Sequence, residues 1–169
     1  MRVTDAVAAT LAGLGADTLF GVVGSGNFQL TNAMISQGTR YIAARHEGGA
    51  ACMADGWART ASRTGLLTVH QGPGLTNAMT GITEAAKSRT PLVVLAADVA
   101  SAAVRSNFRI DVAALATSVG ATAFRLHSPG FAVDEGQEEL GTRLMLPPWL
   151  EPLRAELGHI LPPIKLPKT

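Results

Sequence analysis

Short apolar runs alternate along this chain with longer segments in which apolar residues recur at helical spacing. The short runs predict five strands, over residues 18–23, 41–44, 66–70, 92–97 and 122–126. The longer segments predict five helices, from Thr4 to about Gly13, through Leu30 and Met34 to about Gly38, and over 47–61, 75–87 and 110–119. Strands separated by helices are typical of a parallel sheet. We therefore predict an α/β fold of three layers, in which a mostly parallel sheet of five or six strands has helices on both faces.

The composition of the chain changes after about Pro129. Six of the nine prolines lie at or after Pro147, whereas 15 of the 18 glycines lie at or before Gly130. Because proline disrupts helices and central strands, this asymmetry predicts one domain over residues 1–145 and a proline-rich tail or linker over 146–169. Helical spacing recurs twice beyond Pro129 and predicts one helix at each place, lined by Val133, Leu140 and Leu144 and by Trp149, Leu153 and Leu157.

Composition and charge narrow the classes of partner. Hydrophobic residues make up 47% of the 169 residues and charged residues 16%, which excludes a disordered chain. Lys and Arg total 14 and Asp and Glu total 13, so the net charge of +1 offers no electrostatic footprint for nucleic acid or an anionic membrane. No apolar run is long enough to cross a membrane, and the single Cys52 excludes an internal disulfide. We expect a cytoplasmic protein without a nucleic-acid or membrane partner.

The turns that follow the predicted strands form the candidate site. Ligands of parallel sheets bind at the carboxyl ends of the strands, and glycine lets the backbone approach a ligand closely. Four such turns carry glycine or polar residues, at 24–27, 45–49, 70–74 and 97–98. The signal is weak by itself, because Gly24-x-Gly26 lacks the third glycine of a dinucleotide fingerprint. Glu47, which opens a predicted helix, is also explained by favourable interaction with the helix dipole alone.

Two longer motifs are far more specific. The first runs from His46 to Arg59 as HEGGAACMADGWAR, and the second runs from Leu67 to Gly81 as LTVHQGPGLTNAMTG. Their order and spacing resemble the aminopyrimidine-binding (Pyr) domain of thiamine diphosphate-dependent enzymes, in the group of acetolactate synthase, benzoylformate decarboxylase and pyruvate oxidase. The resemblance extends from about Thr4 to Pro129.

The resemblance implies which residues bind the cofactor, thiamine diphosphate. In this family the glutamate that matches Glu47 hydrogen-bonds a ring nitrogen of the aminopyrimidine and promotes removal of the thiazolium C2 proton, which implies a catalytic role for Glu47. The turn from Gly72 to Gly74 would pack beside the pyrimidine, and Asn77 would either bond to that turn or cap its helix. The cofactor-binding residues implied in this way are Gly24, Ser25, Glu47, Gly72, Pro73, Gly74 and Asn77.

His70 is the second candidate catalytic residue. Benzoylformate decarboxylase is similar to this chain in having a histidine at this position and a serine at the position of Ser25. An imidazole transfers protons near neutral pH, and a serine hydroxyl binds a substrate carboxylate. A structural, hydrogen-bonded histidine at a strand end is an equally good interpretation of His70. We expect His46, Cys52 and Met53 to serve packing rather than chemistry.

The sequence lacks the motif that forms the other half of the family's site. Relatives hold the diphosphate and Mg²⁺ through a Gly-Asp-Gly motif in another domain, and these 169 residues contain no Gly-Asp-Gly and no predicted metal ligands. The resemblance therefore implies a Pyr domain or subunit of a 2-oxo acid decarboxylase or acetolactate synthase-like enzyme, which needs a diphosphate-binding partner for activity. A catalytically inert truncated fragment and a non-enzymatic interaction module are the alternatives. Apolar faces of the helices at 48–61 and 75–86 predict a homo-oligomer or a complex with that partner.

Overall fold

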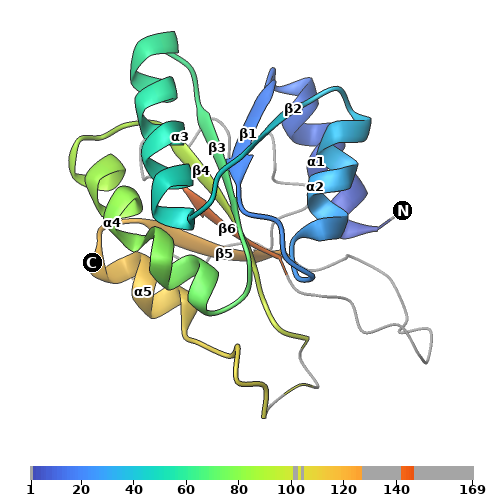
Figure 1. Cartoon of the computed structure of the whole chain (residues 1–169), viewed down its shortest axis with the longest axis vertical. Helices are drawn as coiled ribbons and strands as arrows, with labels where there is room; N and C mark the ends of the chain where they lie inside the picture. Colours follow the sequence, from blue (N-terminus) through green and yellow to red (C-terminus); the bar gives the residue numbers. More distant parts are fainter. Residues whose placement is uncertain (1, 101–102, 104, 127–141, 147–169) are drawn as a thin grey trace, which may run out of the picture.

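The computed structural model of the protein describes residues 2–100, 103, 105–126 and 142–146 (Figure 1). Its helices are α1 (Val3–Gly13), α2 (Phe28–Ser36), α3 (Glu47–Ala61), α4 (Pro73–Lys87) and α5 (Val112–Ser118). Its strands are β1 (Thr18–Gly21), β2 (Arg40–Ala43), β3 (Gly65–Val69), β4 (Leu92–Ala97), β5 (Thr122–Leu126) and β6 (Thr142–Leu146). Helices and strands alternate as far as β5 in the order that the hydrophobic pattern predicts.

The six strands form one sheet in the order β2-β1-β3-β4-β6-β5. The first four are parallel to one another, whereas β6 pairs antiparallel with β4 and with β5. This arrangement confirms a mostly parallel sheet of five or six strands. Leu144, which we assign to a helix from its spacing, instead pairs in β6 with Leu95 and Phe124, because short apolar segments fit both periods. The remaining residues of that predicted helix, and the proline-rich tail with its second predicted helix, lie outside the described residues.

Helices cover both faces of the sheet, as predicted (Figure 1). On one face α1 and α2 bury a cluster with strand residues, including Leu11, Met34 and Leu66. On the other face α3, α4 and α5 bury a second cluster. Helix α3 turns its alanines to the sheet, which places Cys52 and Met53 on its exposed side. The prediction that these two side chains serve packing within the chain is therefore wrong.

The strand order places a topological switch point between β1 and β3. From β1 the chain moves outward to β2 and then returns to β3 on the other side of β1. Helix α2, which follows β1, lies on one face of the sheet, and α4, which follows β3, lies on the other. Open α/β sheets bind their ligands at the carboxyl ends of the strands at such a point. The fold alone therefore predicts a ligand site at the turns after β1 and β3.

Two details of the helices differ from the prediction. Helix α1 begins one residue before Thr4, and Asp5 accepts a hydrogen bond from the Arg2 backbone N–H at 3.2 Å. Arg2 is therefore the N-cap, its own N–H is satisfied by Asp5, and Thr4 lies inside the helix. None of the helices within the described ranges is long and apolar enough to cross a membrane.

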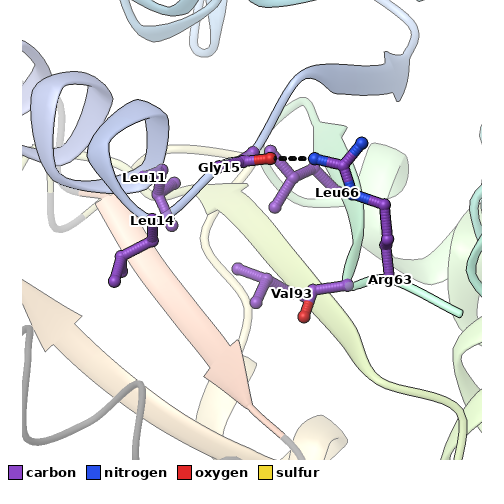
Figure 2. A pocket seen from close by; sticks show the side chains of 8 residues that line it. Leu11, Leu14, Gly15, Arg63, Leu66 and Val93 are labelled. Carbon is purple, nitrogen blue, oxygen red and sulfur yellow. Dashed lines mark hydrogen bonds between the residues drawn. The ribbon is translucent and has the colours of Figure 1, made fainter.

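Arg63 joins three elements at the amino edge of the sheet, opposite the carboxyl ends of the parallel strands. Figure 2 shows its guanidinium donating to the Gly15 carbonyl, close to Leu11 and Leu14. It also pairs with Asp17 at 2.6 Å and lies over the Trp57 ring, 5.6 Å from the centroid. A cavity of about 230 Å³ is lined here mainly by apolar side chains and by Arg63. Because every one of these contacts is internal, we interpret Arg63 as a structural residue.

The ion pair between Asp17 and Arg63 predicts a small pH dependence of stability. Burial opposes ionisation of Asp17, but hydrogen bonds from Arg63 and Thr18 outweigh it and lower the pKa of Asp17 from 3.8. A lowered folded-state pKa stabilises the fold above about pH 4, and that stabilisation is lost as the pH falls through the folded pKa. Both side chains are about half exposed, 45% and 51%, so we expect less than about 0.5 kcal/mol.

Urea unfolding of Asp17→Asn across this pH range measures the effect. The variant should be slightly less stable than the native protein at neutral pH and equal to it in strong acid, below the folded-state pKa of Asp17. The difference should vanish in an Arg63→Gln background. A difference that persists in strong acid, or without the guanidinium, contradicts this account.

Candidate functional site

The turns after β1, β2 and β3 meet at one edge of the sheet, because these strands are parallel neighbours. The predicted site residues lie in these turns or in the helices that follow them: Gly24, Ser25, Glu47, His70, Gly72, Pro73, Gly74 and Asn77. Most of them are in direct contact in the structure. The turns can approach one another this closely because glycines stand where a side chain would separate them.

Glu47 is the first residue of α3 and is half-buried. Its Oε2 accepts a hydrogen bond from Asn77 Nδ2 at 3.1 Å. A Cβ built at Gly74 would lie 3.4 Å from Glu47 Oε1 and 3.1 Å from His70 Cβ, so glycine keeps the space between the two side chains open. Oε1 has no hydrogen-bond partner among the described residues. The carboxylate is therefore held by one oxygen and keeps the other available.

His46 fixes the start of α3. Its Nδ1 accepts a hydrogen bond from the Gly48 N–H at 3.1 Å, and the side chain is exposed. We expected His46 to serve packing, but it caps the helix instead, in the way that Asn or Asp commonly does. A cap at this position holds the backbone of Glu47 in a defined orientation at the helix N-terminus.

Asn77 takes neither of the two roles that its position predicts. Gly72 is the N-cap of α4, and the Asn77 side chain does not cap the helix. It donates instead to Glu47, across the interface between α3 and α4 and 30 residues away in the chain. The contact arises because α3 and α4 pack closely against each other. Sequence spacing alone carries no signal for such a pair.

His70 follows β3 and is fixed on several sides. Its Nδ1 accepts a hydrogen bond from the Gly26 N–H at 3.1 Å, 44 residues away. The Phe108 ring lies edge-on to the imidazole, with 5.4 Å between the ring centroids and 61° between the planes. A Cβ at Gly24 would lie 2.8 Å from His70 Cγ. The half-buried imidazole therefore joins the turn after β1 to the turn after β3.

Gly72 and Pro73 shape the start of α4. Gly72 has φ +57°, a conformation that favours glycine, and a Cβ there would also lie 2.7 Å from the Phe108 carbonyl oxygen. Pro73 occupies the first turn of α4, where its missing N–H has no intrahelical partner to lose. Phe108 was not predicted as a site residue. The only signal for it in the sequence is an aromatic residue in the segment after an apolar strand. In the structure its side chain is partly exposed.

Gly24 and Ser25 lie in the turn after β1. The Gly24 N–H donates to Oδ1 of buried Asn27 at 2.7 Å, which holds the turn, whereas Ser25 is exposed. Asn27 belongs to the turn at 24–27 that the sequence analysis singled out, but it was not among the predicted site residues. Within the described ranges, no group of three or more His, Cys, Asp or Glu side chains is placed to hold a metal ion.

Comparison with known proteins assigns this arrangement to a family. The family model described as thiamine pyrophosphate enzyme, N-terminal TPP binding domain, matches residues 1–118. Thiamine pyrophosphate is another name for thiamine diphosphate. The match includes α1 to α5 and every residue of the candidate site.

Curated relatives are similar over about half of the chain. A probable 2-ketoarginine decarboxylase of Pseudomonas aeruginosa is 40% identical over 91 residues, which are 54% of this chain and 16% of that protein. The acetolactate synthase large subunit of Lactococcus lactis is also 40% identical over 91 residues, 53% of this chain and 16% of that protein. A sulfoacetaldehyde acetyltransferase of Castellaniella defragrans is 36% identical over 95 residues, 56% of this chain and 16% of the relative. The aligned part thus spans about one sixth of each relative.

Two solved structures have a similar fold. A thiamine diphosphate-dependent 4-hydroxybenzoylformate decarboxylase of Rhodococcus jostii aligns with a TM-score of 0.63 and 28% identity, over 68% of this chain and 22% of that one. A putative thiamin diphosphate-dependent enzyme from Mycobacterium smegmatis aligns with a TM-score of 0.61 and 27% identity, over 67% of this chain and 22% of the other. With the family match over residues 1–118, these similarities show that the chain belongs to the N-terminal, TPP-binding domain family of thiamine pyrophosphate enzymes.

Proposed function

We propose that this chain binds the aminopyrimidine half of thiamine diphosphate through Glu47 and so contributes to an enzyme that acts on a small 2-oxo acid. The observation that carries the proposal is the contact between Glu47 and Asn77 beside Gly74. One carboxylate oxygen is held at 3.1 Å and the other has no partner among the described residues, next to space that a side chain at position 74 would fill. A pyrimidine ring nitrogen is a suitable partner for that free oxygen when a proton is shared between the two.

The side chains present fit this half of the cofactor. Gly74 places no side chain between Glu47 and His70, so no Cβ blocks the approach of a flat ring to the carboxylate, whereas Gly72 lies against the Phe108 backbone. Asn77 orients the carboxylate, and Pro73 restrains the turn. When bound, thiamine diphosphate supplies the electron sink that decarboxylation of a 2-oxo acid requires. Glu47 holds or exchanges a proton at the pyrimidine nitrogen, which is the role we propose for it as a catalytic residue.

His70 and Ser25 belong to the substrate side of the proposed site. His70 lies within contact distance of both Gly24 and Gly74, so it is next to Glu47 and to the turn that carries Ser25. An exposed hydroxyl at Ser25 is suited to binding a carboxylate. The relatives support a 2-oxo acid as substrate, since two of them are named as a 2-ketoarginine decarboxylase and a hydroxybenzoylformate decarboxylase.

The other half of the cofactor needs a second domain. No Gly-Asp-Gly occurs in the 169 residues, so we propose that a diphosphate-binding domain holds the diphosphate and Mg²⁺, on the same polypeptide or on a partner. The exposed side of α3, with Met53 37% exposed, is the surface that we propose for this partner or for a second copy of the chain. The lone cysteine, Cys52, fits a cytoplasmic location.

Calorimetric titration separates the two halves of the site. We expect the chain alone to bind thiamine and thiamine diphosphate weakly and with equal affinity, because it contacts only the pyrimidine. With Mg²⁺ and a Gly-Asp-Gly-containing domain from the same genome, thiamine diphosphate should bind at least about tenfold more tightly than thiamine.

Two outcomes of the titration contradict the proposal. The first is tight binding of thiamine diphosphate but not of thiamine by the chain alone, which requires a diphosphate site here. The second is no binding even with the partner domain. Oxythiamine diphosphate, which carries an oxo group in place of the 4-amino group, is the matched control and should bind more weakly than the natural cofactor.

A further inference from the structure

Asn27 is a buried polar residue beneath the proposed substrate side, with 1% of its surface exposed. Its Oδ1 accepts from the Gly24 N–H at 2.7 Å, and its Nδ2 donates to the Val22 carbonyl at 3.0 Å and to the Thr68 hydroxyl at 3.1 Å. One side chain thus ties the turn after β1 both to itself and to the neighbouring strand β3. The position of that turn relative to β3 depends on these three hydrogen bonds.

Gly26 lies in the same turn, and its backbone determines which ring nitrogen of neutral His70 carries the proton. Its N–H donates to Nδ1 of His70 at 3.1 Å. A backbone N–H only donates, so Nδ1 presents a lone pair and carries no proton. The single proton of the neutral imidazole is therefore on Nε2. A Cβ at Gly26 would lie 2.6 Å from Gln71 Cδ, so the close approach of this turn requires glycine.

The imidazole is held in this orientation by the hydrogen bond from Gly26 and by packing against two neighbours. The backbone of Gly24 lies against the ring, and Phe108 packs edge-on to it. Nε2 has no hydrogen-bond partner among the described residues, and none of their buried polar side-chain atoms is without a partner. Nε2 is therefore not fully buried. It is the ring nitrogen of His70 that is left available to a bound molecule.

We propose that Asn27 and Thr68 are positioning residues that act through the backbone of Gly24–Gly26 and hold His70 with its proton on Nε2. His70 then faces the site as a hydrogen-bond donor, which selects an oxygen acceptor such as the carbonyl or carboxylate oxygen of a 2-oxo acid. The other tautomer would present Nε2 as a base. The identity of the acceptor rests on the proposed function, whereas the tautomer does not.

Nitrogen-15 NMR of the full chain without cofactor tests the tautomer directly. Two-bond correlation spectra, recorded at a pH where the histidines are neutral, report which ring nitrogen carries the proton, and His70→Gln identifies the His70 signal among those of the four histidines. We expect one tautomer for His70, with the proton on Nε2. A proton on Nδ1, or a mixture of both tautomers, overturns the proposal.

Two substitutions of Thr68 test the positioning role. Thr68→Val removes the hydroxyl at nearly constant shape, and Thr68→Ser keeps it. We expect the valine variant to populate both tautomers and to exchange the Gly26 amide about tenfold faster with solvent, while the serine variant behaves like the native chain. Asn27→Asp provides a second route, since a carboxylate accepts from Gly24 but cannot donate to Thr68.

The outcomes separate this proposal from the proposed function. If Thr68→Val and Asn27→Asp both keep a single tautomer and a protected Gly26 amide, Asn27 and Thr68 are not positioning residues. If the native tautomer and the variants behave as expected but the reconstituted complex shows no thiamine diphosphate-dependent activity, the positioning role holds and only the proposed function is wrong.

Discussion

Glu47→Gln is expected to lower thiamine diphosphate-dependent turnover of a 2-oxo acid by the reconstituted complex by about 10²-fold or more. The physical reason lies in the two oxygens of the carboxylate. Asn77 donates to one of them, so a glutamine would keep its carbonyl oxygen toward Asn77 and place its NH₂ group where Oε1 now lies. The pyrimidine nitrogen would then face a neutral donor that cannot accept a proton. Steady-state rates and cofactor titrations on the same preparation separate this effect from a loss of binding.

Glu84→Gln is the matched control for this substitution. Glu84 lies on α4, is 62% exposed on its side chain, and pairs only with Arg59 and Ser88 among the described residues. Removing an exposed ion pair changes stability little, so its turnover should stay within about a factor of two of the native rate. Equal rates for Glu47→Gln and the native complex would exclude a proton-transfer role for Glu47. Equal losses in both variants would indicate a general effect of removing charge.

Gly81→Ala is expected to destabilise the fold by about 1–3 kcal/mol, although alanine is the better helix former. Gly81 lies where α4 crosses α3, and a Cβ there would lie 2.5 Å from the Ala51 Cβ and 3.1 Å from its backbone carbonyl carbon. No flexible side chain can move aside, so the two helices must separate. Because α3 carries Glu47 and α4 carries Asn77, the same separation should weaken cofactor binding.

Gly56→Ala is the control, because it makes the same chemical change inside α3, and the new Cβ would meet no atom within 4 Å beyond its chain neighbours and the adjacent backbone of its own helix. It should stabilise the protein by about 0.5–1 kcal/mol through the smaller backbone entropy of the unfolded chain. Urea unfolding of both variants measures the difference. A Gly81→Ala protein as stable as Gly56→Ala would show that the helices do not depend on glycine at their contact.

The local pattern of apolar and polar residues was enough to predict most of the helices and strands. The boundaries of α3, β4 and β5 were predicted to the residue. In each of these segments the residues fit only one of the two periods, helix or strand, and glycine, proline or charged residues mark the ends. The turns at 24–27, 45–49 and 70–74 were also predicted as the site, since parallel strands bring their carboxyl ends to one edge. The antiparallel β6 was missed, because five residues with apolar positions at Leu144 and Leu146 fit either period.

By itself, the sequence thus determined the α/β class, the edge of the sheet that carries the candidate site and the family motifs around Glu47 and His70. Tertiary structure alone decided what these side chains contact: Asn77 meets Glu47 across 30 residues, the Gly26 amide meets His70 across 44, and Phe108 covers the imidazole. The exposure of Cys52 and the capping role of His46 were decided at the same level. Periodicity records which face of an element is buried, whereas a hydrogen bond between two turns depends on how closely their helices and strands pack, and here glycines at 24, 26, 74 and 81 set that distance.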